Sequence, residues 1–577
     1  MASPAGITVY NLPPSPPNLD AVGRFYLAFL ATWTTLVFSG MGFLIWNRRS
    51  PILRVRGLGL SLTAILFLQA YWVLAQLTYP IGQTMPVLLA YDIQYFFMGI
   101  WFPLGIALFH ASNLRFLHVA QKQKRYAQLG YQGRDGCNGS RTSWLCRLRN
   151  MSYTSRVMIF IGFGMVIQVL LTIGMWMACR KYHPTFGIPG TGLKTTTVPE
   201  QLAELGQGWE WWPQVIWQVV WSWIVAPILI WRSRGIKDTL GWRFQTIACC
   251  LSSLHATPMW LIASYVPAFG PINAYFAPSY WLHLSSMMFE IFTVFVPCWL
   301  VIRHKMMQRK VDLSRAKWDT LSQTTTLRGS MQVDSKWRSA SVMEKGSTID
   351  LLNEELGDRL LTMGALDHVL NDNPAPLQEF SAMRDFSGEN IAFLTQVAAW
   401  QTSWPESPTQ NEVRALFTRA LGIYVDFISP HDADFPINLS SPDLKQLENL
   451  FEKTARILYG EARVNPATPF GAGSFSGSCQ RGSDSDTGSS HGKSAGITSR
   501  VQYTGDISDE FDRSVFETAQ QHIKYLVLTN TWPKFVRECQ KDRQSIDSER
   551  SEDTKYSQAS FASKVSSLIQ SVSSRVR

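Results

Sequence analysis

The stretch LDHVLNDNPAPLQEFSAMRDFSGENIAFLTQVAAW, residues 366–400, decides the fold of the second half of the chain. Its prolines and a capping residue predict three short helices. Pro374 ends the first helix, because proline disfavours helical geometry at the residue before it. Pro376 opens the second at a position where its missing N–H costs nothing. Ser387 is expected to cap the third, with Glu389 in the first turn, where a negative charge suits the helix dipole.

Apolar residues recur at helical spacing in the second and third of these segments. Such stripes are typical of amphipathic helices that pack on a common core. The residues are Leu377, Phe380 and Met383 in the second segment, and Ile391, Leu394, Val397 and Ala398 in the third. The sequence therefore predicts a small all-α bundle here.

One run within this stretch also resembles a family signature. DFSGEN, residues 385–390, followed by Ile-x-Phe, resembles the signature of RGS domains, the regulators of G-protein signalling. Gly388 stands where that family usually has an acid, and Leu394 where it usually has Trp. Two further matches follow in the family's order. They are the loop PINL, residues 436–439, and the closing segment VFETAQQHIKYLVLTNTWPKFVREC, residues 515–539.

The resemblance implies a set of residues that would contact a GTP-bound Gα subunit. It assigns Glu389 and Asn390 to the switch segments, Asp385 to the rim and Asn438 to the place nearest the catalytic glutamine of Gα. Leu526 would pack against a switch, while Asn530 and Lys534 occupy the family's usual Asp and Arg positions. Lys534 keeps the charge but loses the fork geometry of arginine. The alternative for each residue is an ordinary solvated helix face.

Composition separates the chain into two unlike parts. Its 577 residues imply at least two domains. Up to Lys310 there are 25 Lys and Arg against 8 Asp and Glu, and 17 of the 22 Trp. This basic, apolar and tryptophan-rich part points to a lipid bilayer rather than to nucleic acid. The eight Cys form no CxxC pair, so neither a metal site nor a disulfide framework is indicated, and no cofactor is expected.

Seven apolar runs before residue 305 are long enough to cross a bilayer. They are approximately residues 25–46, 57–77, 87–109, 157–178, 212–231, 244–266 and 280–302. The first run is too long for the core of a cleaved signal peptide, and no small-residue cleavage pattern follows it. The sequence thus predicts a seven-transmembrane helix bundle followed by a cytoplasmic RGS-type helical bundle.

Loop charges predict the orientation of the bundle. Lys and Arg gather in the first, third and fifth loops and after the seventh run, whereas the intervening loops are nearly free of them. The positive-inside rule then puts the N-terminus outside and everything after Arg303 in the cytoplasm. The expected location is the plasma membrane. Seven spans before an RGS-like domain resemble the seven-helix RGS proteins of filamentous fungi and plants. The long Ser/Gly-rich insert favours the fungal type.

Two carboxyl groups fall within the predicted spans. Asp92 and Glu290 are candidates for an intramembrane polar site, because ionisable residues in spans are commonly functional. The alternative is that each makes an interhelical hydrogen bond that holds the bundle together. If they line an external pocket, its ligand cannot be read from these residues.

These observations predict five segments. They are an extracellular N-terminus, 1–24; a seven-transmembrane domain, 25–305; a cytoplasmic linker, 306–350; an RGS domain, 351–540, with a disordered Gly/Ser-rich insert at 461–507; and a flexible Ser-rich tail, 541–577.

Three functions are compatible with this organisation. The first is a membrane receptor that ends a signal by accelerating GTP hydrolysis on Gα, as an activator and not itself an enzyme. The second is a scaffold that docks Gα without accelerating hydrolysis. The third is a seven-helix transporter, which the lack of internal repeats and of paired broken helices disfavours.

Overall fold

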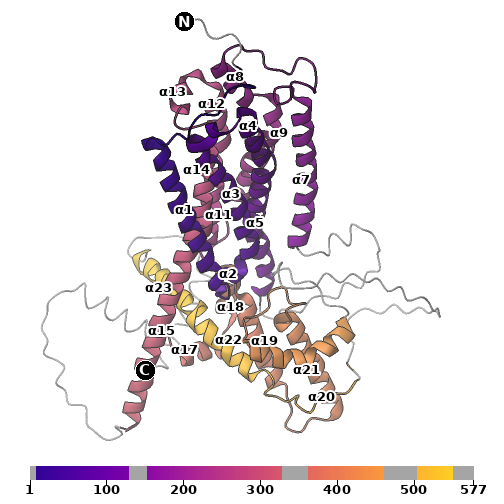
Figure 1. Cartoon of the computed structure of the whole chain (residues 1–577). Coiled ribbons are helices and arrows are strands. Elements are labelled where there is room, and N and C mark those ends of the chain that lie inside the picture. Colours follow the sequence, from indigo (N-terminus) through magenta and orange to yellow (C-terminus); the bar gives the residue numbers. More distant parts are fainter. Residues whose placement is uncertain (1–7, 129–152, 328–360, 460–502, 504, 550–577) are drawn as a thin grey trace, which may run out of the picture. The chain divides into compact units, whose positions relative to one another are not determined.

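The computed structural model describes residues 8–128, 153–327, 361–459, 503 and 505–549, and every regular element within these ranges is a helix (Figure 1). The all-α prediction is confirmed for this part of the chain. Contacts divide the chain into two compact units. The first comprises Met1–Leu129, Ser140–Gly388 and Val527–Arg577, and the second comprises Gly130–Gly139 and Glu389–Leu526.

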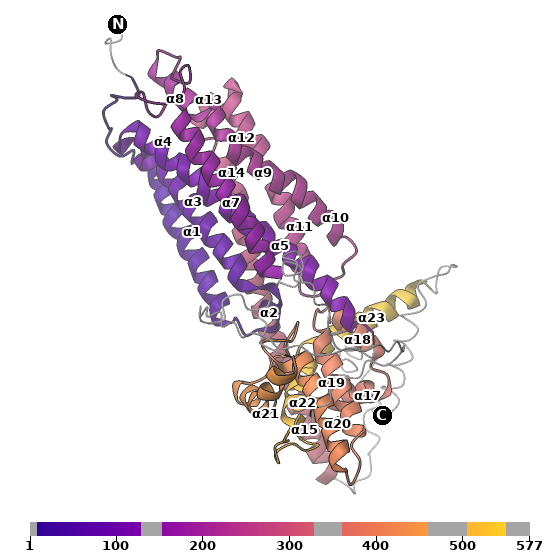
Figure 2. The ribbon, with the colours of Figure 1, turned by 90° about the vertical axis from the view of Figure 1, so that its right-hand side faces the viewer.

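Seven helical stretches in the first unit are long and apolar enough to cross a membrane, as predicted. They are Ala21–Trp46, Leu58–Thr84, Val87–Tyr126, Ser155–Ala178, Val198–Ser233, Trp242–Tyr265 and Tyr280–Arg309. The chain is therefore a multi-pass membrane protein by the length and composition of its helices. Helix α3 packs against both α1 and α5 in the bundle (Figures 1 and 2).

The elements of the bundle follow one another along the chain from residue 21 to residue 327. They are α1 (Ala21–Trp46), α2 (Pro51–Arg56), α3 (Leu58–Ile81), α4 (Val87–Phe96), α5 (Phe102–Gln123), α7 (Tyr153–Ala178), α8 (Val198–Gly206), α9 (Trp212–Val219), α10 (Ala226–Ser233), α11 (Trp242–Ser253), α12 (Ala256–Tyr265), α13 (Gly270–Asn273), α14 (Tyr280–Glu290) and α15 (Val296–Leu327). A 3-10 turn, η3 (Lys124–Tyr126), extends the end of α5.

Three of the spans contain a wide π turn, and each turn ends just before a proline. Pro103, Pro227 and Pro297 each stand two residues beyond such a turn. Proline has no N–H to donate, and its ring clashes with the carbonyl four residues earlier, so the preceding turn widens. The turns are η2 (Phe97–Trp101), η5 (Val220–Val225) and η7 (Ile291–Phe295).

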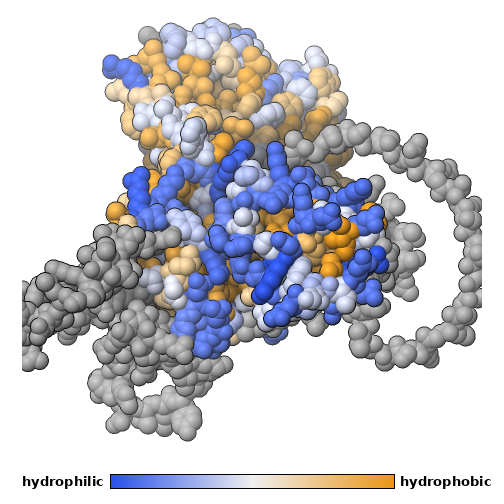
Figure 3. Space-filling view, turned by 90° about the horizontal axis from the view of Figure 1, so that it is seen from below, coloured by the Kyte–Doolittle hydropathy of each residue, from blue (hydrophilic) through white to orange (hydrophobic). Residues whose placement is uncertain are grey.

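The bundle has a packed interior and an apolar outer surface. Inside, the rings of Phe109 and Phe289 stack with centroids 4.1 Å apart. Outside, Phe160, Phe163 and Leu170 of α7 are exposed, as side chains facing lipid must be. Hydrophobic residues of the bundle are visible in orange at the upper edge of Figure 3.

Seven α-helices follow the bundle in the described part of the chain, and the first three cover most of residues 366–400. They are α17 (Met363–Asp372), α18 (Ala375–Met383), α19 (Gly388–Thr402), α20 (Gln410–Ile423), α21 (Ser441–Tyr459), α22 (Glu517–Thr529) and α23 (Thr531–Glu549). The break predicted at Pro374 is confirmed, because α17 ends at Asp372 and α18 begins at Ala375. Leu377 and Phe380 are buried, whereas Met383 is exposed.

An aromatic core holds the second unit together. The ring of Phe451 on α21 stacks on that of Phe516 at 5.8 Å, and Trp400 of α19 contacts Phe516 at 5.4 Å. Segments on either side of the predicted insert thus share one core. The insert itself, 461–507, lies outside the described residues except for 503 and 505–507. The predicted linker beyond 327 and the tail beyond 549 also lie outside them.

Candidate functional site

The turn between α18 and α19 holds a buried carboxylate that accepts hydrogen bonds from four side chains. Asp385 is only 2% exposed. The donors come from three separate parts of the first unit, namely the turn itself, α23 and the loop between α10 and α11. They are Ser387 Oγ at 3.0 Å, Thr531 Oγ1 at 2.8 Å, Lys534 Nζ at 2.7 Å and Thr239 Oγ1 at 2.7 Å. A buried charge is stable only with such partners.

The backbone of this turn is unusual. Phe386 has a φ of +50°, a conformation that costs a residue with a side chain about 1–2 kcal/mol. The N–H groups of Arg384 and Asp385 both donate to the carbonyl of Phe380, which closes the end of α18. The buried Phe386 ring meets Phe116 of α5 edge-on at 5.8 Å. This packing offsets the strain and aims the Asp385 carboxylate inward.

Three of the predicted Gα-contacting residues meet in this network. Lys534 donates to Asp385 at 2.7 Å and to the amide oxygen of Asn530 at 2.9 Å. The Lys534 side chain is 14% exposed and that of Asp385 is fully buried. The structure thereby joins one residue of the DFSGEN run to two residues of the closing segment, about 150 positions later in the sequence.

The other four predicted residues belong to the second unit. Glu389 and Asn390 lie in the first turn of α19 and are buried, at 8% and 4% exposure. Asn438 lies in the loop before α21 and is half-buried, as is Leu526 near the end of α22. Their roles toward Gα stay predictions.

Thr239 is a member of the network that the sequence analysis did not find. It lies in the short loop between α10 and α11, where Arg56 and Asp238 fix the backbone. Arg56 donates to the carbonyl of Leu240 at 2.6 Å, and Asp238 accepts from the N–H of Arg243 at 2.8 Å. Burial lowers the pKa of Arg56 to about 10 and raises that of Asp238. A threonine in a short polar loop carries no sequence signal of such a contact.

The two predicted intramembrane carboxylates each have a different partner. Asp92 accepts from the indole N–H of Trp176 at 2.7 Å, and Glu290 accepts from that of Trp33 at 2.5 Å. Glu290 is fully buried. Each pair joins two different helices, which fits the structural alternative weighed for these residues. A pocket that they share stays a prediction.

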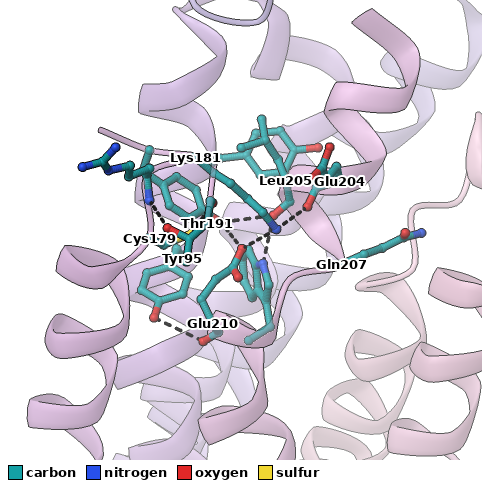
Figure 4. A network of polar contacts seen from close by, with 12 residues as sticks. Tyr95, Cys179, Lys181, Thr191, Glu204, Leu205, Gln207 and Glu210 are labelled. Carbon is teal, nitrogen blue, oxygen red and sulfur yellow. Dashed lines mark hydrogen bonds and ion pairs between the residues drawn. The ribbon is translucent and has the colours of Figure 1, made fainter. Parts of the chain in front are cut away.

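A second buried ion pair anchors the loop between α7 and α9 (Figure 4). Lys181 Nζ lies 3.3 Å from Glu210 Oε1, and their side chains are 9% and 0% exposed. Tyr182 also donates to Glu210 Oε1 at 3.4 Å, while Tyr95 donates to the Glu210 carbonyl at 3.3 Å. Burial, with Glu210 nearby, raises the pKa of Cys179 to about 11, so that thiol stays protonated. The sequence pattern did not single out this network.

No group of three or more His, Cys, Asp or Glu side chains within the described ranges is arranged to hold a metal ion. The chain matches none of the known protein families, curated proteins or solved structures with which it was compared.

Proposed function

We propose that this protein is a membrane receptor-like regulator of G-protein signalling. Its helical second half binds a GTP-loaded Gα subunit and accelerates the hydrolysis of that GTP, which ends the signal. The proposal rests on the three motif matches in their family order and on the seven apolar helices that precede them.

One observation carries this proposal furthest. Asp385, Asn530 and Lys534 were assigned to Gα on sequence motifs alone, and Lys534 hydrogen-bonds to each of the other two. The resemblance gives the last two positions to Asp and Arg in other members of the family. The pair found here, Asn and Lys, still hydrogen-bonds, and Asp385 supplies the negative charge. Lys534 therefore keeps both a hydrogen bond and a negatively charged partner after the two substitutions.

The proposed mechanism is transition-state stabilisation of another protein's reaction. Gα carries its own catalytic arginine and glutamine and hydrolyses GTP at about 10⁻² s⁻¹ alone. Asn438, Glu389 and Asn390 would bind its switch segments in the arrangement that the transition state needs, which is differential binding. A preference of roughly 2–3 kcal/mol for that arrangement gives about a hundredfold acceleration.

The proposed orientation follows from the loop charges. Basic residues gather in the odd-numbered loops and after the seventh span, so we propose an N-terminus outside the cell and a cytoplasmic second half. The second half would then lie on the side where Gα resides, and the plasma membrane is the natural location. A ligand for the bundle is part of the proposal, and its chemistry is open.

A scaffold is the alternative, and the burial of the site favours it. Asp385 and Asn530 are 2% and 3% exposed, so Gα cannot reach them without a rearrangement. A protein that docks Gα through other surfaces would not need these groups.

Single-turnover GTP hydrolysis by a purified Gα subunit distinguishes the two functions. The full chain in lipid nanodiscs is compared with Asn438→Ala, and binding to Gα carrying GDP and aluminium fluoride is measured in parallel. Acceleration that Asn438→Ala abolishes supports the activator. Binding without acceleration supports the scaffold, and neither binding nor acceleration contradicts both.

A further inference from the structure

We infer that the end of the membrane bundle clamps the turn between α18 and α19, and that this clamp restrains access of Gα to the turn. The inference rests on the proposed function, since the turn carries Asp385 of the predicted Gα site. All of the contacts that form the clamp lie within the first unit.

Thr239 forms the first half of the clamp. Its backbone N–H donates to the carbonyl of Arg384 at 2.9 Å, and its hydroxyl lies 2.7 Å from Asp385 Oδ1. Lys534 approaches the same oxygen at 2.7 Å. A Gα subunit that bound Asp385 would therefore have to displace Thr239 from it. The loop that holds Thr239 is fixed from behind by Arg56 and Asp238, so displacement requires the bundle itself to move.

The end of α5 forms the second half of the clamp (Figures 1 and 2). Gln123 Oε1 accepts the N–H of Gly388 at 3.1 Å. The first N–H groups of a helix have no partner within it, so Gln123 supplies a cap that α19 needs. Gln378 of α18 donates to the carbonyl of Tyr126, which follows Gln123 in the 3-10 turn.

Gly388 shows why this chain departs from the family pattern at that position. A Cβ at residue 388 would lie 2.8 Å from the Cβ of Tyr126 and 2.7 Å from that of Ala382. The acid that the resemblance leads one to expect here would collide with both neighbours. Its replacement by glycine allows the end of α5 to approach the turn. Close packing on both α18 and the end of α5 therefore requires glycine at this position.

The arrangement couples two equilibria. Gα binding and bundle docking compete for one turn, so a change that separates the turn from Thr239 and Gln123 favours Gα. By linkage, Gα binding favours the same change in the bundle. The turn offers a carboxylate and the N-terminus of a helix. In this structure the loop that carries Thr239 and the end of α5 bind these groups.

Removal of one clamp donor tests the inference. Thr239→Val keeps the shape of the side chain and removes the hydroxyl, while Thr239→Ser keeps a hydroxyl. In full-length protein in nanodiscs, Thr239→Val should raise the acceleration of single-turnover GTP hydrolysis by Gα by roughly three- to tenfold. Thr239→Ser should behave as wild type. Gln123→Leu should change the rate in the same direction as Thr239→Val.

Matched controls separate this inference from the proposed function. Thr35→Val removes an exposed hydroxyl that donates to the carbonyl of Ala31 within α1, and it should change nothing. Adding Asn438→Ala to Thr239→Val should abolish the gain. If the acceleration depends on Asn438 but is equal in wild type and Thr239→Val, the proposed restraint by the clamp is refuted and the proposed function is not. No acceleration by any variant refutes both proposals.

Hydrogen exchange provides a readout that does not depend on Gα. The amides of Ser387 and Gly388 should exchange several-fold faster in Thr239→Val than in wild type or Thr239→Ser. Unchanged exchange would show that Thr239 does not hold the turn.

Discussion

At the scale of single residues, two buried carboxylates in this protein are each met by an ammonium group and by further donors. Asp385 and Lys534 form one such pair, and Lys181 and Glu210 form another. Taking a charge out of water costs several kcal/mol, and the loss of one partner leaves that cost uncompensated in the folded state. Each pair therefore predicts a large effect of a single substitution.

Lys181→Met should destabilise the loop between α7 and α9 strongly. It leaves the fully buried Glu210 carboxylate without its ammonium, at a cost of about 3–5 kcal/mol. Adding Glu210→Gln should recover much of the loss. Thermal unfolding in detergent, followed by labelling of the buried Cys249 and Cys250, measures both effects.

The control for this pair is Lys194→Met in the same loop, since the Lys194 side chain is exposed. It should leave the unfolding temperature unchanged. Equal losses in Lys181→Met and Lys194→Met would mean that the buried pair contributes nothing specific.

Lys534→Met should loosen the turn between α18 and α19 and weaken Gα binding. Asp385 would keep its hydroxyl donors but lose its only ammonium partner within the described residues. We expect a loss of local stability of about 3 kcal/mol, measured by hydrogen exchange of Ser387. Lys453→Met, at an exposed position on α21, is the matched control. Unaltered exchange in Lys534→Met would contradict the network.

At the scale of elements, local sequence signals decide where helices begin, widen and end. Prolines widen three spans into π turns, and Pro374 separates α17 from α18. Helix α20 begins with a capping box, in which Thr409 and Glu412 each bond the other's backbone N–H. Such a box satisfies two N–H groups that the helix cannot.

Thr409→Ala should destabilise the start of α20 by about 1 kcal/mol, because the N–H of Glu412 loses its acceptor. Hydrogen exchange of the first turn of α20 provides the measurement. Thr402→Ala, which removes an exposed hydroxyl bonded within α19, should have little effect on that turn. The cap is unimportant if both variants exchange alike.

The same box gives a pH dependence. The N–H of Thr409, and then its hydroxyl, hold the pKa of Glu412 below its ordinary 4.5. The Glu412 carboxyl thus binds a proton less tightly in the folded state than in the unfolded state. Its contribution to the stability of the start of α20 is therefore present above pH 4.5, and it is lost as the pH falls through the lower pKa of the folded state.

Glu412→Gln should therefore differ from wild type in the exchange of the first turn of α20 at neutral pH, and the difference should vanish in acid. A difference that persists unchanged in acid would mean that the charge of Glu412 is not its cause.

At the scale of the whole molecule, the charge asymmetry and the seven apolar helices predict opposite sides for the two ends of the chain. A tag with a protease cleavage site, added after Arg577, should be cut by external protease only once cells are permeabilised. The same tag placed before Met1 should be cut on intact cells. Cleavage of both tags on intact cells would contradict the proposed topology.

The sequence by itself determined the helical class, the seven spans and the break at Pro374. These features depend on local quantities, namely the length of apolar runs, their period and the missing N–H of proline. Asp385, Asn530 and Lys534 were marked in another way, by the resemblance of two motifs to the RGS signature.

Only the tertiary structure decided which of these residues meet. Thr239 and Gln123 reach the turn at Asp385 because α5 and the loop before α11 end beside α18, and the Lys181–Glu210 pair forms because a loop folds back on the bundle. A hydrogen bond between residues about 150 positions apart, such as Thr239 and Asp385, depends on the path of the whole chain, and no local pattern records that path.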